Sequence, residues 1–125
     1  MHRQGAAAYQ MVAKQTASPR DLEANLLSKA AANFQRIRDD WDAHNGDLSG
    51  ALRFNRRLWN VFLTSVTRED NPLPRPIREN VANLGLFVLS HTLRTEANPQ
   101  AHKLDVLINI NRELASGLRA AADNQ

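Results

Sequence analysis

The chain has 125 residues, 42% of them hydrophobic, which is enough apolar material for one core but not for two. It contains no cysteine, which excludes disulfides, thiolate zinc sites and cysteine nucleophiles and fits a reducing compartment. The net charge is only +3, from 16 Lys and Arg against 13 Asp and Glu, and is a weak argument for nucleic acid binding. Because no apolar run is long enough for a membrane span or a secretory signal, we expect a cytoplasmic protein.

The N-terminal region is expected to be a loose arm over residues 1–17, with at most one short helix, followed by a single helical domain over residues 18–122. The domain opens with a helix start signal, Ser18 as N-cap and Pro19 at the first helical position. This first helix is predicted to continue to about Trp41, with its apolar side chains on one face. An Asn-Gly turn, which favours positive φ, ends it.

Three further helices are predicted, over residues 47–67, 76–95 and 100–122, separated by a proline-rich extended linker at 71–76 and by Asn98-Pro99. Apolar residues spread widely around the second and third of these segments, so the helix at 76–95 is expected to be central. The sequence therefore predicts an all-α protein, a bundle of about four helices with up-and-down topology. The proline linker leaves open a second arrangement, in which two hairpins splay apart.

Catalytic and metal-binding motifs are lacking in the sequence, which has no phosphate loop, no His-Glu-x-x-His and no nucleophile elbow. The four histidines never stand at the i, i+4 spacing of a metal pair. The segment Asp40–Gly46 resembles a calcium loop, but its glycine comes one place late and Ala51 replaces the closing glutamate. We expect a protein that is not an enzyme and that uses no metal, cofactor or small-molecule substrate.

Several polar residues of the helices have more than one interpretation. Asn55 and Asn111 either form an interhelical hydrogen bond or bind the backbone of an inserted peptide. His91 is either a hydrogen-bonded interior residue or a ligand-contacting, pH-sensing group. The basic cluster Arg53, Arg56 and Arg57 is either a solvated and ion-paired face, a contact for an acidic patch, or an RNA site.

Several short segments, in their order and spacing, resemble the flagellar biosynthesis regulator FlaF family over roughly Tyr9 to Leu118. They are Ser18-Pro19-Arg20-Asp21-Leu22-Glu23, Asn55-Arg56-Arg57-Leu58-Trp59, Asn71-Pro72-Leu73-Pro74, Arg78-Glu79-Asn80, Leu84 to His91, and Asn109-Ile110-Asn111-Arg112 with Gly117-Leu118. The resemblance implies a non-enzymatic cytoplasmic protein of bacterial flagellum assembly. It also implies a role in flagellin production and type III secretion, alongside the translational regulator FlbT.

The leading functional hypothesis is a flagellin export chaperone that holds amphipathic terminal helices of flagellin in an apolar groove. The expected groove residues are Trp59, Phe62, Leu63, Leu86 and Phe87, with Arg57 and Arg78 at the rim and Asn55, His91 and Asn111 as further partner contacts. The alternative is a post-transcriptional regulator that binds flagellin mRNA through Arg36, Arg38, Arg53, Arg56 and Arg57. On the simplest view, the wide apolar helices only build a core.

Overall fold

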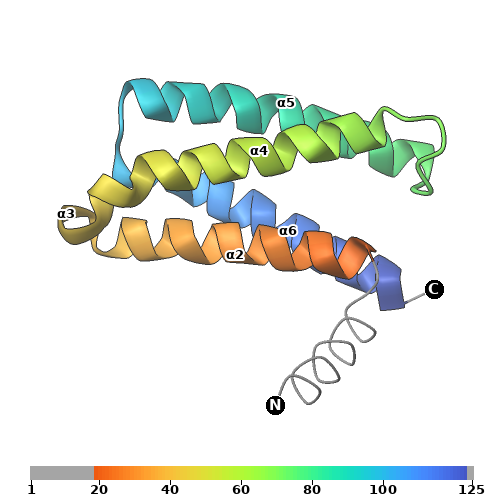
Figure 1. Cartoon of the computed structure of the whole chain (residues 1–125), viewed down its shortest axis with the longest axis horizontal. Coiled ribbons are helices and arrows are strands. Elements are labelled where there is room, and N and C mark those ends of the chain that lie inside the picture. Colours follow the sequence, from red (N-terminus) through yellow and green to blue (C-terminus); the bar gives the residue numbers. More distant parts are fainter. Residues whose placement is uncertain (1–18, 124–125) are drawn as a thin grey trace, which may run out of the picture.

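The computed structural model describes residues 19–123, with side chains to residue 121, and these residues are helical with short connections (Figure 1). The helices are α2 (Pro19–Asp39), α3 (Trp41–His44), α4 (Leu48–Val66), α5 (Arg75–Ala97) and α6 (Leu104–Asp123), with 3-10 turns at Asn45–Asp47 and Ala101–Lys103. The all-α prediction is therefore confirmed. The expected arm over residues 1–17 and the Ser18 cap lie outside the described residues.

The four long helices alternate in direction, as expected for up-and-down topology (Figure 1). They pack mainly as two pairs, α2 against α6 and α4 against α5, and contacts between α2 and α4 join the pairs. Helices α5 and α6 are consecutive in the chain but share few contacts. Figure 1 shows them meeting at the connection between them and diverging toward the other end of the molecule.

One hydrophobic core occupies the space between these pairs. Its largest fully buried side chains include Phe34 and Ile37 of α2, Trp59 of α4, and Leu107 and Ile108 of α6. The buried positions on α2 recur at spacings of three and four residues, which is the period of a helix with one apolar face. The central part of the predicted apolar face is buried as expected, whereas Leu22 and Leu26, which were expected on the same face, are 49% and 41% exposed.

The position of α5 contradicts the expectation that this helix would be central. Its buried residues, Val81, Gly85, Val88, Thr92 and Thr95, form one narrow stripe, and most of its other side chains are exposed. The stripe consists of small residues because α5 lies very close to α4. A side chain at Gly85 would place its Cβ atom 2.7 Å from Leu63 Cδ2. The large apolar residues of α5 therefore lie outside the close helix contact.

The junction between α2 and α4 also differs from the prediction. The first helix ends at Asp39, and Asn45–Asp47 form a 3-10 turn in place of an Asn-Gly turn with positive φ. Within residues 19–123 no residue has positive φ. The Asn45 side-chain amide donates a hydrogen bond to the Trp41 carbonyl at 2.8 Å, so the asparagine terminates the short α3 helix by bonding its backbone.

The connection between α4 and α5 is held by side-chain hydrogen bonds. Asn71 Nδ2 donates to the carbonyl and the hydroxyl of Ser65, at 3.1 and 3.0 Å. Asn71 Oδ1 accepts a hydrogen bond from the Leu73 backbone at 3.0 Å, and Pro74 is extended with φ −56° and ψ 145°. The predicted rigid, extended linker is confirmed, and Asn71 rather than proline alone fixes its path.

Candidate functional site

A buried polar network links α4 to α6. Trp59 Nε1 donates to Asn111 Oδ1 at 2.9 Å, and Asn111 Nδ2 donates to Asn55 Oδ1 at 2.8 Å. All three side chains are fully buried. Because the indole nitrogen can only donate, it fixes the orientation of Asn111, which in turn fixes Asn55. Of the two interpretations of these amides, the structure supports the interhelical hydrogen bond, so neither amide is open to a peptide.

The groove expected along α4 is not open in this structure. Trp59 and Phe62 belong to the core, with the two rings packed edge to face at a centroid distance of 5.6 Å. Leu63 is half-buried against Gly85. These residues were expected on the surface because their apolar arc is wide, but that arc is covered jointly by α2, α5 and α6. Their predicted groove position is corrected to a core position.

An apolar groove does lie elsewhere, between α5 and α6 where the two helices diverge. We call it the α5–α6 groove. It has a volume of about 240 Å³ and is lined by Ile77, Asn80, Val81 and Leu84 of α5 and by Ile110, Glu113 and Leu114 of α6. Ile77 is 44% exposed and Leu84 37%. Since Val81, Ile110 and Leu114 form its floor and walls, a side chain entering the groove would meet mostly hydrocarbon.

Phe87 and His91 extend the same face of α5 beyond the groove, because residues spaced by three or four lie on one side of a helix. Phe87 is 41% exposed and stacks on the His91 ring at a centroid distance of 5.5 Å. His91 Nε2 donates to the Lys103 carbonyl at 2.7 Å. This bond ties α5 to the start of α6, so the apolar face ends where the two helices are fastened together.

Leu86 and Leu93 are the most exposed leucines of α5, at 63% and 58%. Side chains two positions apart on a helix point in directions that differ by about 200°. Leu86 therefore faces away from Leu84 and from the α5–α6 groove. The expectation that Leu86 and Phe87 line one groove is therefore corrected. The sequence signal that separates them is the stripe of small residues at 85, 92 and 95, which marks the face used for close packing.

The expected rim arginines do not line the α5–α6 groove. Arg78 Nη1 donates to the Arg68 carbonyl at 3.2 Å and so holds the connection after α4. Arg57 is an exposed residue of α4. Glu113 is the one charged residue among the groove's described lining residues. The groove is thus apolar with an almost uncharged border.

The arginines proposed for RNA binding are largely engaged with acidic residues. Arg56 pairs with Glu96 at 3.2 Å, Arg36 with Asp47 at 3.2 Å, and Arg38 with Asp105 at 3.1 Å. Hydrogen bonds to Asp105 and Asp39 raise the pKa of the Arg38 guanidinium. Arg53 and Arg57 form no ion pair with residues that the structure describes, and both are exposed.

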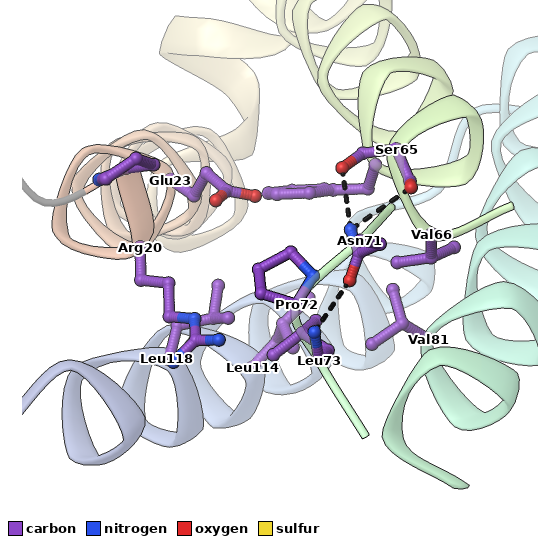
Figure 2. Close-up of a pocket in the computed structure, with 12 residues that line it drawn as sticks. Arg20, Glu23, Ser65, Val66, Asn71, Pro72, Leu73, Val81, Leu114 and Leu118 are labelled. Atoms are coloured by element: carbon purple, nitrogen blue, oxygen red, sulfur yellow. Dashed lines mark hydrogen bonds between the residues drawn. The ribbon is translucent and has the colours of Figure 1, made fainter. Parts of the chain in front are cut away.

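A second cavity lies at the end of the bundle where α2 begins and α6 ends, and we call it the end pocket (Figure 2). Its volume is about 360 Å³. The α4–α5 connection forms one wall through Asn71, Pro72 and Leu73, and Leu114 and Leu118 come from α6. Glu23 of α2 faces the same space as these residues in Figure 2. Burial raises the pKa of its carboxyl, and the nearby Arg20 guanidinium opposes that rise.

Other kinds of site were sought among the described residues. Within residues 19–123, no group of three or more His, Asp or Glu side chains is placed to hold a metal ion. None of the helices there is long and apolar enough to cross a membrane. The α5–α6 groove and the end pocket both offer apolar surface that a partner could cover.

The described residues define a small all-α protein whose distinctive surface is an apolar groove beside a helix hairpin. The chain belongs to the flagellar protein FlaF family, which it matches over residues 5–118. The family resemblance inferred from the sequence is confirmed, and the protein is a flagellar protein. Comparison with curated proteins found no match, and comparison with solved structures found none either.

Proposed function

We propose that this protein is a cytoplasmic flagellin-binding chaperone and regulator that holds an amphipathic terminal helix of flagellin in the α5–α6 groove. The observation that carries the proposal is the exposed apolar stripe of Ile77, Leu84 and Phe87 beside Ile110 and Leu114. An amphipathic helix presents apolar side chains at spacings of three, four and seven residues, and Ile77, Leu84 and Phe87 follow one another at spacings of seven and three. Family membership makes a flagellar partner the relevant one.

The nearly uncharged lining of the groove supports a complex held by apolar contact. Burial of apolar surface stabilises by about 25 cal/mol per Å² and depends little on salt. Contacts with RNA phosphates would instead weaken steeply as salt rises. The mRNA alternative must rely mainly on Arg53 and Arg57, since Arg36, Arg38 and Arg56 are paired with acidic residues.

The test compares binding to full-length flagellin and to flagellin lacking its terminal helices. Leu84→Gln should weaken binding to full-length flagellin by about tenfold or more, as expected for a central apolar contact. Leu86→Gln is the matched control, because it makes the same change on the same helix outside the groove, and its affinity should stay near that of the natural protein. Equal binding to both flagellins, or equal effects of both substitutions, would reject the groove.

Two further measurements separate the remaining possibilities. Affinity for flagellin should change little across a salt titration, whereas steep salt dependence together with binding to flagellin mRNA would favour the alternative. FlbT, the partner that the family resemblance implies, should be tested in the same assay. If Leu84→Gln weakens binding to FlbT and leaves flagellin binding intact, the groove belongs to FlbT instead.

A further inference from the structure

The outer surface between α2 and α4 carries exposed apolar side chains. The two helices lie side by side and antiparallel (Figure 1), and α6 and α5 pack against other sides of them. Leu22 and Leu26 of α2 are 49% and 41% exposed, and Val61 of α4 is 64% exposed. Phe54 stands seven residues before Val61 and so lies on the same side of α4. We call the surface formed by these four residues the α2–α4 face.

A contact between the helices shows that both apolar rows face the same surface. Lys29 Nζ lies over the Phe54 ring, 5.9 Å from its centroid, and Lys29 follows Leu26 by three residues on α2. Beside this contact is a hollow of about 520 Å³, with Phe54 on the α4 side and Asn33 on the α2 side. Its charged lining residues, Lys29 and Arg36, are both cations. The volume lies within the usual range for binding sites, so the hollow accepts a side chain of a partner.

The charge on this side of the bundle has one sign. Residues 24–38 of α2 and the whole of α4 include six Lys and Arg residues and no Asp or Glu. Lys29 and Arg57 are exposed and form no ion pair with the residues that the structure describes. Arg57 follows Phe54 by three residues on α4, so it borders the α2–α4 face. The cations of these stretches that are paired with acidic residues are Arg36, Arg38 and Arg56.

Acidic residues at the ends of the face already have cations beside them. Glu23 lies near Arg20, and Asp47 pairs with Arg36 at 3.2 Å. The two cations that border the middle of the face are therefore left without an acidic partner among the described residues. Negative charge on a partner would be attracted to this position, which favours one orientation of the complex as well as faster association.

A helix whose apolar stripe is bordered by acidic residues has the complementary pattern. We propose that the α2–α4 face binds such an acidic, amphipathic helix of a protein partner, with its apolar side chains against the two leucines and Val61 and its carboxylates facing Lys29 and Arg57. A negatively charged membrane is a poorer match, because a flat bilayer surface does not enter the hollow beside the half-buried ring of Phe54. The site is separate from the α5–α6 groove and does not depend on what that groove binds.

The test uses two fluorescent helical peptides and the full chain. Both peptides carry leucines at spacings of three and four residues, and the residues on either side of that stripe are glutamates in one peptide and glutamines in the other. The glutamate peptide should bind about fivefold more tightly at low salt, as expected for two exposed ion pairs, and this advantage should shrink as salt rises. Arg57→Gln should reduce the advantage, whereas Arg94→Gln, which changes an exposed arginine of α5, should not.

Substitutions at exposed apolar positions locate the contact without damage to the core. Val61→Gln should weaken binding of the glutamate peptide about tenfold, whereas Leu93→Gln, at a similarly exposed position of α5, should have little effect. No binding of the glutamate peptide, equal binding of the two peptides at low salt, or equal effects of the two substitutions would overturn the proposal. A loss of binding with Leu84→Gln and not with Val61→Gln would place the peptide in the α5–α6 groove and would also overturn it. Binding to phosphatidylglycerol vesicles that Val61→Gln abolishes, without binding of the peptide, would assign the face to a membrane instead.

Discussion

The buried polar network of Trp59, Asn111 and Asn55 predicts both the sign and the size of the changes in unfolding free energy that substitutions cause. Replacing Asn111 by Ala removes two hydrogen bonds and strands the Trp59 indole N–H and the Asn55 amide away from water. Each of the two stranded groups costs about 1–3 kcal/mol, so the free energy of unfolding should fall by about 2–6 kcal/mol. Asn55→Ala alone should cost only about 1 kcal/mol, because it leaves Asn111 Nδ2 without its acceptor but also removes Asn55 Nδ2, which already lacks a partner among the described residues.

The effects of Asn111→Ala and Asn55→Ala on the free energy of unfolding should not be additive. Once Asn111 is absent, the Asn55 amide has no described partner at either atom, so its removal relieves a buried polar group. In the Asn111→Ala background, Asn55→Ala should therefore cost nothing or stabilise the protein by about 1–2 kcal/mol. The cost of the cavity left by each shortened side chain is similar in both backgrounds, so it largely cancels when the four proteins are compared as a double-mutant cycle.

The measurement is urea unfolding of the four proteins, followed by far-UV circular dichroism, with constant m-values as the check on two-state behaviour. Asn109→Ala is the matched control, since Asn109 is exposed on the same helix, and its effect should be within about 0.5 kcal/mol. If Asn55→Ala has the same cost in both backgrounds within about 0.5 kcal/mol, the network does not couple α4 to α6.

Three further predictions concern other contacts. Gly85→Ala should be less favourable than Gly50→Ala by about 1–3 kcal/mol in urea unfolding, because its Cβ meets Leu63 while Gly50 faces open space; Leu63→Ala should remove most of that difference. Asn71→Ala should lower the unfolding free energy by about 1–3 kcal/mol through loss of the bonds to Ser65 and Leu73, and a neutral result in the same assay would show that the prolines alone hold the connection. Glu23→Gln should stabilise the protein near neutral pH. The raised pKa of Glu23 gives a contribution to folding stability that is present below the ordinary value of 4.5 and is lost as pH rises through the pKa of the folded protein. In thermal unfolding the two proteins should differ little at acidic pH, and a difference independent of pH would contradict this.

The sequence predicted those features of the fold that depend on residues close together in the chain. Apolar spacing and proline geometry predicted the approximate ends of α4 and the extended path through Asn71 to Pro74, and the structure agrees with both. The predicted face of α2 is buried except at Leu22 and Leu26. The paired roles of Asn55 and Asn111 followed from the need of a buried amide for a partner. Their interhelical bond is one of the two alternatives that the sequence left open.

The location of the groove could not be predicted, because it depends on which helices pair. A wide apolar arc on α4 is consistent with a groove or with burial by several neighbours, and only the α4–α5 and α2–α6 pairing decides between them. Leu84 and Leu86 are equally apolar in the sequence, yet they face different surroundings on α5. Gly85, which lies between them, is the residue in the sequence that marks the close approach of α5 to α4.

The position of Asn111 also limits how α6 can be placed along the core. A slide of one helical turn, about 5.4 Å, would bring Leu107 or Ala115 to the place of Asn111, and both are buried apolar residues that a hydrophobic core alone would accept. Neither side chain can accept a hydrogen bond from the Trp59 indole N–H. A single amide among interchangeable apolar side chains thus gives the helix one preferred register and makes its shifted alternatives unfavourable.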